Sequence, residues 1–123
     1  MLTDLMQDIV TPARSHIPVS ERGRVSLVQV DKILFMRAEQ KYVCLKTLER
    51  EHLLEESLSR LEQEFSDSFV RVHRNCLVSR AHILSFEREG AMGDGQWLVR
   101  LRGLEAALPV SRRQQHVIKQ LAA

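Results

Sequence analysis

The sequence predicts a mainly β fold of small antiparallel β-sheets, with one short helix in the middle of the chain and another at its C-terminal end. Three observations predict it. Short apolar or alternating runs recur along the chain, separated by residues typical of turns. Beyond residue 16, two stretches carry apolar residues at helical spacing. The close spacing of many short strands favours small antiparallel sheets over a βαβ arrangement.

Length and composition are those of one soluble domain. The chain has 123 residues, enough for a single domain and too few for two. The charged fraction of 28% argues against a membrane protein, and no run approaches the roughly 18 apolar residues of a spanning helix. The N-terminus lacks the basic region of a signal peptide. Two cysteines, Cys44 and Cys76, cannot form a disulfide framework, so we expect a cytoplasmic protein.

Residues 1–16 are predicted to be a linker or N-terminal appendage to a domain that covers residues 17–123. Thr11 and Pro12 end a short amphipathic stretch in this appendage. Its apolar side chains at helical spacing are Leu2, Leu5, Met6 and Ile9. Two interpretations stay open, a fraying linker or a helix for dimerisation or docking, because an isolated helix of this length is marginal in water.

Five strands are predicted in the first half of the domain, over residues 16–19, 25–28, 33–36, 42–47 and 52–54. Pro18 suits an edge strand because proline lacks an amide proton. Residues 33–36 are a continuous apolar run, the pattern of a strand buried on both faces, and a turn at 29–32 precedes them. Residues 42–47 alternate and return through a turn at 48–51, which predicts a hairpin.

The second half begins with a helix and continues as strands. Ser57 is the predicted N-cap of that helix, whose apolar face is formed by Leu58, Leu61 and Phe65. Strands are then predicted over residues 69–73, 83–87, 96–102 and 104–110, with the glycine-rich residues 90–95 as a hairpin loop. Ser111 is predicted to cap the C-terminal helix, whose apolar residues are Val117, Ile118 and Leu121.

No catalytic constellation is found, so the sequence predicts neither an enzyme nor a cofactor. It lacks the glycine-rich phosphate loops, the zinc-protease motif and the serine-nucleophile motif. His73 and Cys76 form an H-x-x-C pair, but a zinc site needs about four nitrogen or sulfur ligands. Scattered histidines and Cys44 are all that could complete it, so we expect no metal and a core cysteine at position 44.

Positive charge is concentrated in the second half of the chain. Residues 1–68 carry a net charge of −3, whereas residues 69–123 carry +5, and eight of the nine cations there are arginines. The planar fork of arginine suits phosphates and guanine edges, so the asymmetry hints at a polyanionic partner.

Three clusters carry this chemistry. In residues 69–80, a strand with alternating cations runs into a loop at Arg74 and Asn75, side-chain types that pair with guanine and adenine. Residues 111–113 put two arginines at the start of a helix, where an anion is favoured. Residues 39–42 form a loop that enters a strand. Each cluster also has a purely structural interpretation. The first would be a solvated strand face with salt bridges to the acidic half of the chain. In the second, one arginine would cap neighbouring carbonyls, and the third would be an ordinary turn with a half-buried tyrosine.

Four segments share their order and spacing with a known family: VDKILF at 30–35, KYVCLKT at 41–47, FVRVHRNCLVS at 69–79 and LPVSRR at 108–113. Taken together they resemble the LytTR DNA-binding domain, found at the C-terminus of LytR/AlgR-type bacterial response regulators. The resemblance runs over about residues 17–123. It implies a fold of small antiparallel sheets whose loops, rather than a recognition helix, enter successive major grooves of a DNA duplex.

The resemblance also implies roles for residues of the three clusters. Contacts to DNA bases fall on Tyr42, Arg74, Asn75, Arg112 and Arg113. Contacts to the DNA backbone fall on Lys41, Arg71, His73, Ser79 and Arg80.

The function implied is sequence-specific binding of double-stranded DNA by a bacterial transcriptional regulator, as the effector part of a two-component response regulator. Expected partners are direct repeats in promoter DNA and, if the chain is part of a longer protein, a receiver domain; no membrane is expected. We expect a monomer in isolation and a dimer on DNA. The main alternative is a protein-interaction module of a signalling complex without DNA binding. RNA binding is less favoured because aromatic residues make up 5% of the chain.

Overall fold

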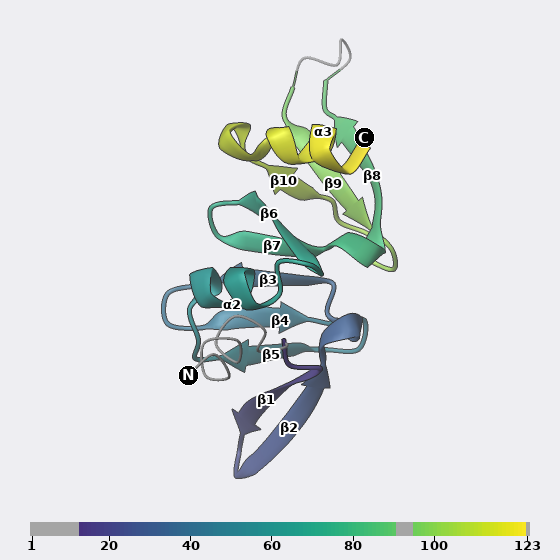
Figure 1. Ribbon diagram of the computed structural model, residues 1–123. Helices are drawn as coiled ribbons and strands as arrows, with labels where there is room; N and C mark the ends of the chain where they lie inside the picture. Colours follow the sequence, from purple (N-terminus) through teal and green to yellow (C-terminus); the bar gives the residue numbers. More distant parts are fainter. Residues whose placement is uncertain (1–12, 91–94, 123) are drawn as a thin grey trace, which may run out of the picture.

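The computed structural model describes residues 13–90 and 95–122, and three antiparallel sheets follow one another along the molecule (Figure 1). The first pairs β1 (His16–Glu21) with β2 (Arg24–Gln29). The second has the order β5 (Glu51–Leu54), β4 (Val43–Lys46), β3 (Phe35–Ala38), β7 (Cys76–Ser79), β6 (Phe69–His73). The third has the order β10 (Leu108–Val110), β9 (Trp97–Leu101), β8 (Ile83–Arg88). The predicted fold class is confirmed.

The helical segments are short. Each α-helix of the described residues is seven residues long, α2 over Leu58–Glu64 and α3 over His116–Ala122. Among the described residues, the 3-10 turns η1 (Val30–Lys32) and η2 (Arg80–His82) connect strands, and η3 (Arg112–Gln114) connects β10 to α3. Across residues 13–90 and 95–122, no helix is long and apolar enough to cross a bilayer. The predicted helix within residues 1–12 and most of the predicted glycine-rich loop lie outside the described residues.

The central strands of the five-stranded sheet are buried on both faces, because a separate hydrophobic core covers each face. Phe35 and Met36 are neighbours in β3, yet Met36 belongs to the core shared with β1, β2 and α2, whereas Phe35 belongs to the core shared with β9, β10 and α3. This alternation explains why the segment reads as one continuous apolar run. The predicted N-cap of α2 is confirmed, since Ser57 Oγ accepts a hydrogen bond of 3.1 Å from the Arg60 amide.

Several predicted elements need correction. β7 was not predicted as a strand; it lies between β3 and β6, and all four of its residues are buried, so no alternation marks it. The predicted strand over 104–110 shortens to β10, because Gly103 has a positive φ of 79° and a turn follows β9. Ser111 precedes η3 but makes no side-chain cap, and α3 begins at His116.

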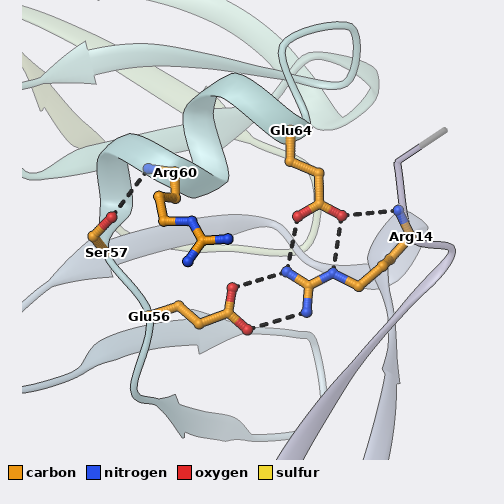
Figure 2. A network of polar contacts seen from close by, with 5 residues as sticks. All are labelled: Arg14, Glu56, Ser57, Arg60 and Glu64. Atoms are coloured by element: carbon orange, nitrogen blue, oxygen red, sulfur yellow. Dashed lines mark hydrogen bonds and ion pairs between the residues drawn. The ribbon is translucent and has the colours of Figure 1, made fainter. Parts of the chain in front are cut away.

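Arg14 fixes the start of the described chain to α2 (Figure 2). Its guanidinium donates to both carboxylate oxygens of Glu64, at 2.9 and 2.8 Å, and to both oxygens of Glu56, at 3.1 and 2.8 Å. The Arg14 amide also donates to Glu64, at 2.9 Å, and the guanidinium lies 5.9 Å from the centre of the Phe65 ring. Arg14 therefore packs with the domain, while the domain limit at residue 17 stays a prediction.

This cluster predicts a pH-dependent contribution to stability. Hydrogen bonds from Arg14 hold the pKa of Glu64 below its usual value. The pKa of Glu64 is lower in the folded chain than in the unfolded chain. Its carboxylate therefore contributes fully to stability above the unfolded-state pKa of about 4.3, and this contribution is lost as pH falls through the folded-state pKa. We expect Arg14→Ala to cost about 1–2 kcal/mol at pH 7, allowing for partial exposure, and progressively less below pH 4 in urea unfolding. A cost independent of pH would contradict this, and the exposed Arg102→Ala is the control.

Candidate nucleic-acid interface

The three predicted clusters contribute loops to one edge of the molecule. β3 pairs antiparallel with both β4 and β7, so the loop after β3 and the turn before β7 meet at the same end of the sheet. The Ala38 amide donates to the Asn75 carbonyl across that end, at 2.8 Å. Two strand spacings, about 10 Å, separate the centres of the loop and the turn. Figure 1 shows both at the left of the view, with η3 above them on the same side.

A β-bulge connects the third loop to the other two. The register between β6 and β7 shifts between Arg71 and His73, so Val72 is an extra residue in β6. Its carbonyl accepts a hydrogen bond of 2.8 Å from the Ser111 amide, at the start of η3. We call residues 39–42, 73–75 and 111–114 together the loop edge.

The loop edge carries cations that are free to meet a partner. Lys41, Arg74, Arg112 and Arg113 are exposed, and none of them forms an ion pair with another described residue. Tyr42 is 39% exposed beside Lys41. Glu39 is the one acid among these three segments. The edge therefore combines positive charge with one aromatic ring, and this composition suits a polyanion.

Backbone hydrogen bonds shape the turn that carries Arg74. The Asn75 amide donates to His73 Nδ1 at 3.5 Å, and His73 and Asn75 are both partly buried. The Asn75 carbonyl is used by Ala38, so both backbone groups of Asn75 have partners inside the domain. Arg74 at the tip is left exposed.

Arg71 is not a free surface cation. Its side chain is 17% exposed and forms an ion pair with Glu62 of α2, with Nη2 and Oε1 2.9 Å apart. The same guanidinium donates from Nη1 to the carbonyl of Arg74. The alternative interpretation of this cluster, a salt bridge from the strand to the acidic half of the chain, describes Arg71.

Ser79 and Arg80 are separated from the loop edge. They follow Arg74 across β7, whose four residues span about 13 Å, and Arg80 begins η2 at the far end of that strand. Ser79 is 4% exposed, and its hydroxyl is 2.8 Å from His82 Nδ1. The sequence placed both residues in one cluster with Arg74, and no strand was predicted between them; β7 carries them to the opposite end of the sheet. A buried Ser79 cannot reach a DNA backbone without rearrangement.

The cysteines lie inside the five-stranded sheet. Cys44 and Cys76 are both opposite Arg37, on the strands that flank β3, so about 10 Å separates them and a disulfide is out of reach. His73 and Cys76 face each other across β6 and β7. Among the described residues, no group of three potential metal ligands comes together.

Burial of both thiols predicts low reactivity. Desolvation raises the pKa of Cys44 and of Cys76 to about 11. Because the thiolate is the reactive form, we expect both cysteines to react with a thiol reagent at pH 8 about 100-fold more slowly in the folded protein than in urea. Stopped-flow absorbance with a chromogenic disulfide measures the two rates; rapid labelling of the native protein would contradict the expectation.

A hollow beside Arg112 contains a cation that the sequence analysis missed. The hollow has a volume of about 510 Å³, and its lining includes Arg88, Arg112 and Gln115. The Arg88 guanidinium lies 5.6 Å from the centre of the Trp97 ring and donates to the Gly95 carbonyl at 3.1 Å. No sequence pattern links Arg88 to Arg112, because 24 positions separate them and they come together only through the pairing of β8 and β10 with β9.

Comparison with known proteins matches residues 23–123 to the model of the LytTR family, described as the LytTr DNA-binding domain. The chain belongs to this family. Its fold also resembles a solved LytTr DNA-binding domain of a methyl-accepting/DNA response regulator from Bacillus cereus, with a TM-score of 0.75 and 22% identity. That likeness covers 89% of this chain and 98% of the solved one.

Two curated relatives are similar to this LytTR domain. The positive alginate biosynthesis regulatory protein of Pseudomonas aeruginosa is 39% identical over 109 residues, which cover 88% of this chain and 43% of the relative. An uncharacterized response regulatory protein of Vibrio cholerae is 31% identical over 108 residues, which cover 84% of this chain and 40% of the relative. The chain thus spans less than half the length of the curated relatives it matches.

Proposed function

We propose that this LytTR domain binds double-stranded DNA in a sequence-specific manner and reads the duplex with its loop edge. One observation carries the proposal. Three loops distant in sequence meet at one edge, and that edge exposes Lys41, Arg74, Arg112 and Arg113 without an ion-pair partner among the described residues. Membership of a family of DNA-binding domains supports it.

The side chains of the loop edge divide into two roles. Arg74, Arg112 and Arg113 suit the O6 and N7 acceptors of guanine, and Asn75 suits adenine. Tyr42 offers an apolar ring to the same base edges. Lys41 and His73 suit phosphates. Arg71, Ser79 and Arg80 are left out of the contact surface, because Arg71 is paired with Glu62 and the other two lie at the far end of β7.

For the protein as a whole, we propose a cytoplasmic bacterial transcriptional regulator. The names of the two relatives, a regulatory protein and a response regulatory protein, support this, as does the length by which both exceed this chain. A receiver domain would fill that length in a two-component system. The domain alone is proposed to be a monomer that binds weakly, and two copies occupy direct repeats on promoter DNA.

Selection of duplexes from a random pool tests the proposal. We expect enrichment of one motif, repeated in direct orientation about one helical turn apart if two copies bind one face of the duplex. Absence of any enriched motif, together with failure to bind heparin, would contradict DNA binding and favour the protein-interaction module.

Lys41 provides a test of a phosphate contact. We expect Lys41→Ala to weaken binding to the selected and to a random duplex by the same factor, and to lower the slope of log affinity against log salt concentration by about one. Fluorescence anisotropy at several salt concentrations measures both. Lys32→Ala is the matched control, because Lys32 is exposed in η1, which precedes β3 and lies away from the loop edge. A changed sequence preference in Lys41→Ala would contradict the role.

A further inference from the structure

We propose that Arg71 and Glu62 form a positioning pair, which fixes the backbone of the turn that carries Arg74 and so sets how well Arg74 reads a base. The inference rests on the proposed function of the loop edge. Neither residue needs to touch DNA in this role. It replaces the DNA-backbone contact that the family resemblance implies for Arg71.

The guanidinium of Arg71, in β6, contacts both α2 and the turn that carries Arg74. Nε of Arg71 donates to Oε1 of Glu62 at 3.0 Å, and Nη2 lies 2.9 Å from the same oxygen in an ion pair. Nη1, on the other side of the fork, donates to the carbonyl of Arg74. The guanidinium therefore connects the side chain of α2 to the main chain of the residue at the tip of the turn. Lysine has no such fork and can satisfy one partner at a time.

The Arg74 turn needs support from outside its own ladder. The bulge at Val72 interrupts the register between β6 and β7 just before the turn. Beyond the bulge, the turn is fixed by the Ala38 bond to the Asn75 carbonyl, by the His73 ring on the Asn75 amide, and by Arg71 on the Arg74 carbonyl. Of these, the Arg71 bond is the one that acts on Arg74 itself.

Glu62 is well placed to orient Arg71 because α2 is anchored on two sides. Leu58 and Leu61 bury one face of α2 against the sheet. Glu64 holds Arg14 through three hydrogen bonds. Positions 62 and 64 are two apart, so their side chains leave the helix in different directions. The carboxylate of Glu62 is thus carried by a helix that has little freedom to shift.

Whether loss of the Glu62 carboxylate weakens or strengthens DNA binding distinguishes a positioning role from a purely electrostatic one. A carboxylate near a DNA-binding edge repels phosphates, so its removal should strengthen binding to every duplex if charge alone mattered. If Glu62 acts through Arg71 and Arg74, its removal weakens binding to the selected duplex instead. Glu39 supplies the matched control, because it is an exposed acid of the loop edge and forms no ion pair among the described residues.

The experiment measures affinity for the selected duplex and a random duplex in Glu62→Gln, Arg71→Lys, Glu39→Gln and Arg74→Ala. We expect Glu62→Gln and Arg71→Lys to lose roughly three- to tenfold on the selected duplex, with random binding and salt slope nearly unchanged. Glu39→Gln should bind both duplexes slightly more tightly. In the Arg74→Ala background, Glu62→Gln should cause no further loss. Urea unfolding of each variant shows whether it is folded. If Glu62→Gln does not fold, Arg71→Lys tests the positioning pair in its place.

Three results would overturn the inference. Glu62→Gln could strengthen binding to both duplexes as Glu39→Gln does, which is the effect of charge alone. Its loss could be as large in the Arg74→Ala background, which would show that Glu62 does not act through Arg74. Arg71→Lys could keep the full affinity for both duplexes, which would show that Arg71 acts through its charge, as in a phosphate contact, and not through the fork that holds Glu62 and the Arg74 carbonyl. If Arg74→Ala itself changes nothing, the proposed function fails rather than the positioning pair.

Discussion

Replacing Arg74 and Arg112 with alanine is expected to remove most of the sequence-specific affinity for DNA. A bidentate contact to a base is worth about 1–3 kcal/mol, so each single variant should bind the selected duplex roughly 5- to 150-fold more weakly. The two residues lie on different loops and share no hydrogen-bond partner among the described residues, so their effects should add in the double variant. Binding to a random duplex should change much less, and fluorescence anisotropy with both duplexes measures the difference.

Arg102→Ala is the matched control for these variants. Arg102 is exposed, and its amide donates to the His82 carbonyl in η2, at the end of β7 opposite the loop edge. We expect its affinity to stay within about twofold of the unmodified domain, since surface substitutions away from a site have small effects. Unchanged affinity in the Arg74→Ala, Arg112→Ala double variant would exclude the loop edge as the base-reading surface.

Phe65→Ala is expected to cost about 3–5 kcal/mol of unfolding free energy, a large share of the stability of a small domain. Phe65 is 2% exposed and packs edge to face on Phe69, with ring centroids 6.3 Å apart. It follows the last turn of α2, and the Arg14 guanidinium lies over its ring. The variant therefore leaves a cavity under α2 and removes an apolar surface from Arg14. Urea unfolding followed by circular dichroism measures the loss.

An exposed leucine gives the comparison for Phe65. Leu27 of β2 is 66% exposed, so Leu27→Ala should change the unfolding free energy by no more than about 0.5 kcal/mol. A Phe65→Ala variant with a loss as small as that of Leu27→Ala would show that α2 does not depend on this contact for its packing.

The elements predicted correctly are those whose signals are local. Ser57 and the apolar face behind it mark α2, and the alternation over residues 42–47, followed by a turn, marks β4 and its hairpin partner β5. β7 was missed because it is short, shows no alternation and directly follows Arg74 and Asn75, which were predicted to form a loop. That one omission also explains why Ser79 was grouped with Arg74.

The arrangement of the site depends on contacts that no local pattern encodes. The loop after β3 and the turn before β7 meet because β3 pairs with a strand some forty residues later in the chain. The sequence alone indicated which lysine and arginine side chains could bind a polyanion. That they lie on a common edge was implied by the resemblance to a family. The pairing of Arg71 with Glu62 could not be predicted, because several acids of the first half were equally available partners.

The cluster around Arg14 has a practical consequence for where this domain is cut. A shortened chain that starts at residue 17 has the strands and helices named above, from the second residue of β1 onward. It would, however, leave Glu56 and Glu64 facing each other without the cation that now lies between them. Recombinant versions intended for crystallisation or DNA titration should therefore begin upstream of Arg14. The shorter version loses both ion pairs of Arg14 and leaves the two carboxylates to repel each other.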